Sequence, residues 1–477
     1  MGPPRSSDGA SRSDPLESFP NEATFPGLPI ATDPERMLAL FRAHLRMLPG
    51  KALDIQRCSP FRFRCRQGGS QGRCVLQYTL RMADPQTGRK WDQWVTGLLY
   101  ADPDEAVGVR QEMEVSNLRT QVLENRLALE PVGFIPELQM PIEVFPYDRK
   151  LTTLGAVMDG ALDGLDSRLL ARLEPGRWRV DERTIEPTRY RTERGAALKY
   201  TIRVHDDQSA RRGSVRCYLK VYRNGRGKET WQLLRSMSER AEAARLYSVV
   251  TPIAYLEELR TLAVEEAPGR ALNELLLQQD DPTEAVRRVA QAMAAFNQDD
   301  LPIARHESRT DRLEDLRRAS SLVEWACPAA RRAVERIAAE VADGLDDSPS
   351  APIHGDMKPD HAFVARSRVT FIDLDSAAMG DPVRDPAQLV AYLAARIRMD
   401  SVPVAQVRKA CTSFVDEYFR HVPASWRTRF PIQYANALLE VATAIFRRQE
   451  PDWPAKVMRA IGMAEQAVSE SSGGGGW

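Results

Sequence analysis

The chain has 477 residues, which is enough for two or three compact units with cores of their own. Apolar residues make up 43%, charged residues 28%, and 66 Lys and Arg balance 66 Asp and Glu, so the composition indicates neither a nucleic-acid nor a membrane partner. No uncharged apolar run approaches the roughly 18–20 residues of a membrane-spanning helix, and residues 1–18 lack the apolar segment of a secretory signal, so we expect a cytoplasmic protein.

The two ends of the chain are poor in apolar residues. Residues 1–30 are rich in Ser, Pro, Asp and Gly, which predicts a disordered tail, and residues 468–477 end in a Ser- and Gly-rich stretch that predicts a second flexible end. The six cysteines form no Cys-x-x-Cys pair and no zinc-like spacing, so we expect reduced thiols.

An internal repeat organises the first half of the chain. Residues 76–81 (Leu-Gln-Tyr-Thr-Leu-Arg) match residues 198–203 (Leu-Lys-Tyr-Thr-Ile-Arg) at an offset of 122, and a near-constant offset continues over some 75 residues. Each copy predicts a hairpin of alternating apolar and polar residues, a long strand, a helix and two further strands. We therefore predict a cap-like first copy at 31–160 and a nucleotide-binding small lobe at 161–268.

The two copies differ in one mid-strand residue. The second copy has Lys220 within the strand pattern of residues 217–222, and the first copy has Leu98 at the equivalent position. A lysine on the inner side of a strand is costly unless it meets anions. The difference predicts that the first copy keeps the fold but has no nucleotide site.

After residue 268 the pattern is helical, and we assign 269–467 to a helical catalytic lobe. Two short strand-like runs interrupt it, one leading into His354-Gly355-Asp356 and the other into Asp373-Leu374-Asp375. Strands that end in short turns would hold two carboxylates at the edge of one cleft. Phosphoryl transfer uses such a pair, because one aspartate orients the acceptor hydroxyl while another holds Mg²⁺ on the nucleotide's phosphates.

The motifs 354–361 (His-Gly-Asp-Met-Lys-Pro-Asp-His), 371–375 (Phe-Ile-Asp-Leu-Asp) and 380–385 (Gly-Asp-Pro-Val-Arg-Asp) resemble the aminoglycoside phosphotransferase/choline kinase-like superfamily. The resemblance covers roughly residues 160–465 and is specific within 351–393. It implies an α+β, protein-kinase-like bilobal fold with a small antiparallel β lobe and a large helical lobe, here preceded by a degenerate duplicate of the small lobe. It also implies transfer of the γ-phosphate of ATP to a hydroxyl of an aminoglycoside, sugar or amino alcohol.

The resemblance implies a catalytic set of Asp356, His354 and Asp385. Asp356 would be the base that accepts the proton of the acceptor hydroxyl. Asp385 would accept backbone N–H groups of the catalytic loop and thereby hold its shape.

The resemblance also implies a nucleotide and metal site. Lys220 would lie on the α- and β-phosphates, oriented by a carboxylate of the following helix, for which we choose Glu242 with Glu239 as the second choice. Gly195 lies in the turn that would form the phosphate loop. Asp373 would hold Mg²⁺, with Asp375 as an additional ligand or hydrogen-bond acceptor.

One position departs from the superfamily pattern. His361 stands where the family places Asn or Gln as a metal ligand, and imidazole suits transition metals better than Mg²⁺. His361 could hydrogen-bond a phosphate, could favour Mn²⁺, or could mark a nucleotide-binding pseudokinase that acts as a scaffold or regulator. We favour the first of these, because Asp356, Asp373 and Lys220 are all present.

The acceptor and the oligomeric state stay open at this stage. Cationic aminoglycosides would require a cluster of carboxylates near the cleft, and the helical lobe shows no excess of negative charge. Sugar kinases of the superfamily also carry an N-terminal cap, so a sugar is an equal candidate.

Overall fold

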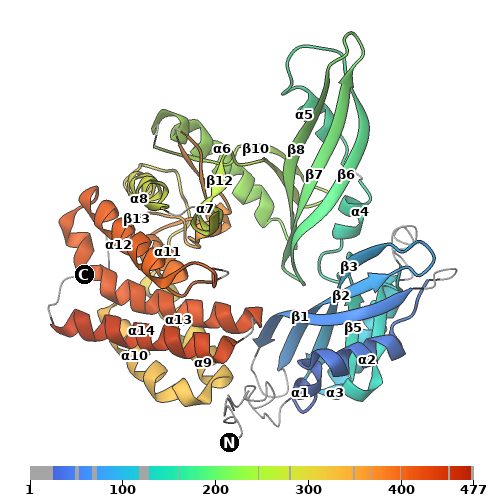
Figure 1. Ribbon diagram of the computed structural model, residues 1–477, viewed down its shortest axis with the longest axis horizontal. Coiled ribbons are helices and arrows are strands. Elements are labelled where there is room, and N and C mark those ends of the chain that lie inside the picture. The colour runs from blue at the N-terminus through green and yellow to red at the C-terminus, as the bar shows by residue number, and fades with distance from the viewer. Residues whose placement is uncertain are drawn as a thin grey trace, which may run out of the picture.

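Two β-rich regions and one helical region follow one another along the chain (Figure 1). The computed structural model describes residues 25–473 except for 49–52, 67–71, 118–127, 161, 245, 279–280, 347–349, 367, 398 and 450–451. Within this part of the chain, no helix has both the length and the apolar character needed to cross a membrane.

The first region is a five-stranded antiparallel sheet with the strand order β1-β2-β3-β5-β4. The helix α3 connects β3 to β4, and α2 packs against β1. Its elements are α1 (Leu28–Ala31), α2 (Pro34–His44), β1 (Asp54–Arg66), β2 (Arg73–Ala83), β3 (Lys90–Tyr100), α3 (Pro103–Asn117), β4 (Val132–Ile135) and β5 (Met140–Val144).

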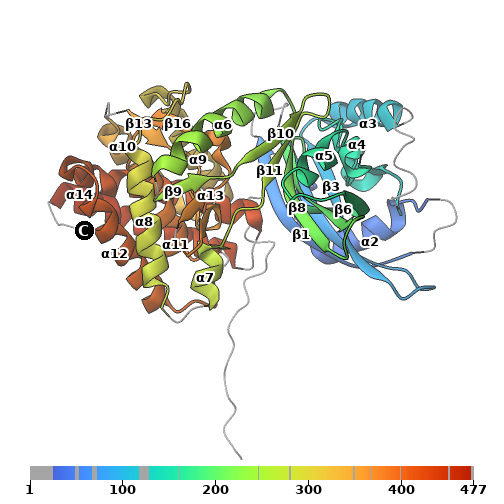
Figure 2. The same cartoon turned by 90° about the horizontal axis from the view of Figure 1, so that it is seen from above.

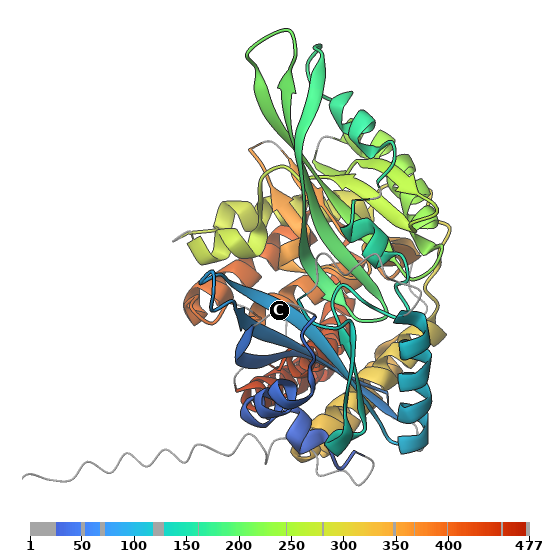
Figure 3. The same ribbon diagram turned by 90° about the vertical axis from the view of Figure 1, so that its right-hand side faces the viewer.

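The second region is a sheet of the same design, with the order β6-β7-β8-β11-β10 and the helix α6 after its third strand. Figure 3 shows it rising above the first sheet. Its elements are α4 (Leu154–Met158), α5 (Leu165–Leu170), β6 (Trp178–Arg191), β7 (Gly195–Asp206), β8 (Arg212–Tyr222), α6 (Arg226–Ala244), β9 (Tyr247–Val249), β10 (Pro252–Leu256) and β11 (Thr261–Glu265).

The strand registers of the two sheets also correspond. Val75 pairs with Leu98 in the first sheet, and Ala197 pairs with Lys220 in the second, so both partners are displaced by 122 residues. Further along the repeat the offset falls from 122 to 121 residues. Gly97 of β3 pairs with Ile142, and the equivalent Leu219 of β8 pairs with Ala263, so the second copy is one residue shorter between these strands. The α+β fold with a duplicated small lobe is therefore confirmed, and Leu98 and Lys220 occupy the same place in the two sheets.

The helical region packs against both sheets, and α6 lies between it and the second sheet (Figure 2). Phe63 on β1 stacks on Trp325 of α9, with ring centroids 6.0 Å apart, so the first sheet contacts the helices directly. The helices are α7 (Leu272–Gln278), α8 (Thr283–Asn297), α9 (Arg309–Ala326), α10 (Arg331–Gly344), α11 (Arg384–Ala394), α12 (Val404–Arg420), α13 (Phe430–Arg448) and α14 (Trp453–Gly473).

Short strands inside the helical region carry the two aspartate motifs. One small sheet has the order β12-β14-β15-β9, and a second consists of β13 and β16. These strands are β12 (Arg270–Ala271), β13 (Ala351–Ile353), β14 (Ala362–Val364), β15 (Val369–Phe371) and β16 (Ala378–Gly380). Because β13 leads into His354 and β15 into Asp373, both motifs lie at strand ends, as their sequence pattern indicates.

The boundaries of the predicted units differ from the structure in three places. The N-terminal tail was expected to reach residue 30, but Phe25 and Leu28 are buried against the first sheet, because two large apolar side chains suffice to anchor the short α1. The first region ends before residue 160, since Leu151 and Leu154 belong to the core of the second sheet. The flexible end was expected from residue 468, but α14 continues to Gly473.

Candidate active site

The loop that follows β13 is shaped by a glycine and a buried carboxylate. Gly355 has φ +74°, and a Cβ atom there would lie 2.4 Å from the carbonyl oxygen of Ser376, so only glycine fits. Asp385 accepts the backbone N–H of His354 at 2.7 Å and that of Gly355 at 3.0 Å. The His354 ring donates from Nε2 to the carbonyl of Ile372 at 2.8 Å, which ties the two aspartate motifs together.

His354 and Asp385 therefore act behind the site and not in it. Both are fully buried, and Asp385 also accepts from the Asn297 side chain at 3.2 Å, which itself accepts from the hydroxyl of Tyr418 at 3.0 Å. Asp385 makes the backbone contacts expected of it, and His354 joins it behind the loop instead of facing a substrate. Neither side chain can contact a substrate, and each holds the backbone of the loop in place.

Asp356 is the member of the predicted catalytic set that faces open space. Its side chain is 30% exposed, and its Oδ2 accepts a hydrogen bond from the Lys358 ammonium at 2.5 Å. Lys358 itself is buried and lies over the ring of Tyr392, 5.5 Å from the centroid. A charge-assisted contact of this kind fixes the rotamer of the carboxylate.

Asp356, His361 and Asp373 converge on one point. Each offers a ligand atom, and these atoms all lie within 4.8 Å of one another. His361 donates from Nδ1 to the carbonyl of Asp356 at 2.9 Å, which leaves Nε2 facing Asp373 Oδ2 at 3.5 Å. Burial lowers the pKa of His361 to about 4 despite the opposing effect of Asp373, so the ring is neutral near pH 7.

This donor set fits a divalent cation. Two carboxylates and a neutral imidazole nitrogen can coordinate Mn²⁺ directly, and they can hold Mg²⁺ together with water. The ring orientation is set by the Nδ1 contact, as is common for metal-binding histidines.

Asp373 lies beside the mid-strand lysine of the second sheet. The Lys220 ammonium donates to Asp373 at 2.7 Å and to Asp375 at 2.9 Å, and Asp375 also accepts from the hydroxyl of Tyr222 at 2.7 Å. Burial opposes the charged forms, but the two aspartates keep the pKa of Lys220 well above its ordinary value, and Lys220 with His361 keeps that of Asp373 well below. Asp373 has φ 63°, a left-handed conformation that costs a non-glycine residue free energy and is found mainly at functional sites.

The partner expected for Lys220 on α6 is described only for the second choice, Glu239. The expected carboxylate was on α6, yet Glu239 is exposed, and the described side chains that pair with Lys220 are Asp373 and Asp375. The side chain of Glu242 lies outside the described residues. Two aspartates on a strand end reach the ammonium, and α6 points Glu239 to solvent, a direction that sequence alone leaves uncertain.

The turn between β6 and β7, predicted as the phosphate loop, is tied to the first sheet. Glu193 is at its apex with φ 62° and is buried, and its carboxylate pairs with Arg64 at 3.2 Å, Arg73 at 2.5 Å and Arg149 at 3.0 Å. Gly195 is the first residue of β7. A Cβ atom at this position would lie 3.0 Å from the carbonyl oxygen of Val221, so little room is left for a side chain. The first repeat therefore holds the loop above the aspartates.

Comparison with known proteins places this geometry in a family. Residues 194–427 match the model of the phosphotransferase enzyme family, APH. The matched range begins at the β6–β7 turn and includes Lys220, Asp356 and Asp373, so the resemblance to that superfamily of small-molecule kinases is confirmed.

Solved structures show partial likeness to this chain. A Ralstonia eutropha protein assigned to the aminoglycoside phosphotransferases has a TM-score of 0.44 at 13% identity, covering 67% of this chain and 98% of its own. A choline kinase from Cryptosporidium parvum gives 0.41 at 11%, covering 61% and 91%. A macrolide 2′-phosphotransferase from Brachybacterium faecium gives 0.37 at 16%, covering 64% and 98%. A search of curated proteins found no match.

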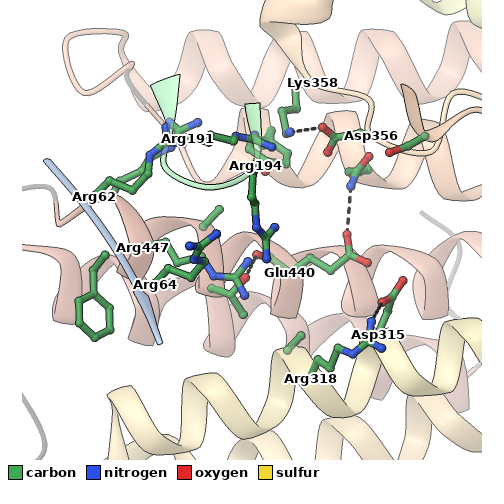
Figure 4. Close-up of a pocket in the computed structure, with 18 of the residues that line it drawn as sticks. Arg62, Arg64, Arg191, Arg194, Asp315, Arg318, Asp356, Lys358, Glu440 and Arg447 are labelled. Carbon is green, nitrogen blue, oxygen red and sulfur yellow. Dashed lines mark hydrogen bonds and ion pairs between the residues drawn. The ribbon is translucent and has the colours of Figure 1, made fainter. Parts of the chain in front are cut away.

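A cavity of about 490 Å³ opens beside Asp356 (Figure 4). Its wall is formed by β1 and β2 of the first sheet, the end of β6 with the β6–β7 turn, and the helices α9, α11 and α13. Neither Asp373 nor Lys220 lines it. The cavity therefore lies on the far side of Asp356 from the Lys220 contacts.

Sequence reasoning missed two features of this site. Lys358 stands two residues after Asp356, and its spacing in the motif was a signal that could have identified it. The arginines of the cavity gave no signal of their own, because they come from segments far apart in the chain, such as Arg62 and Arg447. Only the folded structure brings these residues together.

Proposed function

We propose that the protein is an ATP-dependent phosphotransferase that moves the γ-phosphate of ATP to a hydroxyl group of a small molecule. The observation that carries this proposal is the close approach of four side chains, those of Lys220, Asp373, Asp356 and His361. Lys220 lies 2.7 Å from Asp373, and Asp373 shares its possible metal position with Asp356 and His361. The family match over residues 194–427 supports the same reaction class.

The roles follow from position and charge. Asp356, which faces the cavity, would accept the proton of the acceptor hydroxyl. The hydroxyl oxygen would form a bond to the γ-phosphorus while the bond between the γ-phosphorus and the β-phosphate oxygen breaks. When the nucleotide binds, the Lys220 ammonium would give up its contact with one of the two aspartates and would contact the α- and β-phosphates. Arg189, which lies 3.6 Å from Asp373 and also lines the cavity, would contact the transferred phosphoryl group.

Asp373 and His361 would hold a divalent cation, with Asp356 next to it. Bound there, the cation would neutralise charge on the β- and γ-phosphates. His361 needs no deprotonation for this role, because its pKa of about 4 leaves Nε2 unprotonated. His354 and Asp385 would keep the loop rigid, so that Asp356 and His361 stay aligned with Asp373.

The test is ADP release from ATP in the presence of Mg²⁺ or Mn²⁺ and a panel of hydroxyl-bearing acceptors. We expect turnover with at least one acceptor, a loss of about 10³-fold in Asp356→Asn, and loss of metal-dependent nucleotide binding in Asp373→Ala. An exposed control, Asp400→Asn on the loop before α12, should behave as wild type. No nucleotide binding and no turnover would reject the proposal.

A pseudokinase that binds nucleotide without transfer is the second candidate. Two observations favour it: His361 replaces the amide side chain of the family pattern, and the Lys220 ammonium pairs with both Asp373 and Asp375. In that case Asp356→Asn would leave the cellular phenotype unchanged, while Asp373→Ala would still abolish nucleotide binding. A phenotype lost in Asp356→Asn would reject this alternative.

A further inference from the structure

The cavity beside Asp356 has an unusual charge balance. Ten of its lining residues are Arg or Lys and three are Asp or Glu. The positive side chains come from β1, the end of β6 and its turn, α9, α11 and α13, so they surround the space and do not form a single stripe. The cavity is therefore enclosed on several sides by positive charge.

Several of these cations have no counter-ion. The side chains of Arg191, Arg194 and Arg447 form no hydrogen bond or ion pair among the described residues, whereas Arg384 pairs with Glu307. Figure 4 shows Arg194 extending from the β6–β7 turn toward the helix that carries Glu440 and Arg447. A group in the cavity would thus meet guanidinium donors that are not engaged elsewhere.

The three carboxylates of the cavity already have cationic partners. Glu440 lies 3.6 Å from Arg384 and Asp315 lies 3.2 Å from Arg318. Asp356 is paired with Lys358. None of these contacts involves Arg191, Arg194 or Arg447, so the carboxylates are engaged by other cations.

The arginines also repel one another. Burial lowers the pKa of Arg191, and Arg189 lowers it further; burial and Arg194 act in the same way on Arg447. Each guanidinium nevertheless stays charged near neutral pH. Like charges held together in a partly enclosed space favour the entry of an anion, because it relieves repulsion and satisfies the donors at once.

We propose that this cavity is the acceptor site, and that the acceptor is a small hydroxyl compound bearing phosphate or carboxylate groups. The proposal rests on the proposed function, because it takes Asp356 as the group that faces the acceptor hydroxyl. A volume of about 490 Å³ suits a small molecule. Guanidinium groups bind phosphate and carboxylate through paired hydrogen bonds, and the same charges repel a cationic aminoglycoside.

The first repeat takes part in this recognition. Arg62 and Arg64 from β1 line the cavity, and Arg64 also holds Glu193 at 3.2 Å. Neither arginine lies within residues 194–427, the segment that matches the family. The duplicated sheet thus supplies part of the acceptor site that the family segment does not contain.

Matched acceptors that differ only in charge test the substrate class. ADP release is measured with glucose, glucosamine, glucuronate and glucose 6-phosphate, and with inositol compared with its monophosphate. We expect turnover confined to the anionic members, with a KM that rises with NaCl concentration. Turnover with the neutral or amine-bearing members and not with the anionic ones would overturn the proposal while leaving the phosphotransferase activity established.

A binding experiment tests the cavity without turnover. Protein saturated with Mg²⁺ and AMP-PNP is titrated calorimetrically with inorganic phosphate, with tricarballylate and with spermidine. We expect the anions to bind and spermidine not to bind, and the comparison of phosphate with tricarballylate tells which anionic group is preferred. Binding of spermidine, or anion binding that disappears when AMP-PNP is present, would overturn the proposal.

Variants locate the bound anion. Arg447→Gln should weaken anion affinity about tenfold and raise KM for an anionic acceptor with kcat retained, because one charge-assisted contact is lost. Arg459→Gln on α14 removes the same charge from an exposed position and should change neither value. Equal anion affinity in the two variants would contradict the assignment. If AMP-PNP fails to bind, the phosphotransferase proposal falls, and the same titrations on the free protein still decide whether the cavity binds anions.

Discussion

The two sheets of this protein have the same strand order and matching register, yet they meet the aspartate motifs in different ways. Leu98 is fully buried in the first sheet, and Lys220 at the equivalent place in the second pairs with Asp373 and Asp375. One inward-facing position therefore decides which sheet contacts Asp373, whereas the first sheet reaches Asp356 across the cavity that β1 and β2 help to line. The first sheet has nonetheless acquired another role, because it holds the β6–β7 turn through Glu193.

The largest effect is expected on stability, when a lysine is introduced into the first sheet at the position equivalent to Lys220. Leu98→Lys should lower the free energy of unfolding by about 3–5 kcal/mol, because the ammonium would be buried without a carboxylate partner. Urea denaturation followed by circular dichroism measures the change. A loss below about 1 kcal/mol would show that the two sheets accommodate charge equally and would break the comparison.

Removing the lysine from the second sheet should affect activity more than folding. Lys220→Met should reduce kcat/KM by about 10²–10³-fold, since it deletes the cation expected to bind the phosphates. The matched control is Leu98→Met in the first sheet, a swap of similar volume that should cost less than about 1.5 kcal/mol of stability and leave kcat/KM unchanged. Similar activities in the two variants would contradict the assigned difference.

The contact between the sheets should have an intermediate effect on stability. Glu193→Gln should lower the free energy of unfolding by about 1.5–3 kcal/mol, because the charged acceptor of three arginines is lost. Thermal unfolding and the KM for ATP report the effect on the fold and on the turn. Glu186→Gln, an exposed carboxylate on β6, is the control and should be neutral.

The pH dependence of Glu193 gives a separate check. Burial opposes the charged form, but Arg73, Arg149 and Arg64 hold the pKa of the Glu193 carboxyl below its ordinary value of 4.5. Its contribution to stability is therefore complete above about pH 4.5 and is lost as the pH falls through the lower folded-state value. Wild type should lose more stability than Glu193→Gln between pH 5 and pH 3, and equal losses would exclude the ion pairs as the cause.

The smallest effect is expected for the metal position. With the pKa of His361 near 4, Mn²⁺ affinity should be the same at pH 8 and pH 6, whereas an exposed histidine of ordinary pKa would begin to protonate over that range. Fluorescence or calorimetric titration of Mn²⁺ with AMP-PNP measures this. A marked loss of affinity at pH 6 in wild type, but not in His361→Asn, would show that the ring is protonated there.

Local patterns predicted the parts of the fold that depend on neighbouring residues. The repeat offset anticipated the shared strand register, and the strand-like runs before His354 and Asp373 anticipated their places at strand ends. The exposure of Glu239 could not be predicted in the same way, because it depends on the rotation of α6 relative to the sheet. The basic cavity was also out of reach, since it requires segments as distant as Arg62 and Arg447 to meet.

The ion pairs at Glu193 have a mechanical consequence. They fasten the β6–β7 turn to the first sheet, so β1 and this turn would keep their spacing in any movement against the helical region. The two parts of the cavity wall that the sheets supply would then shift together relative to α9, α11 and α13.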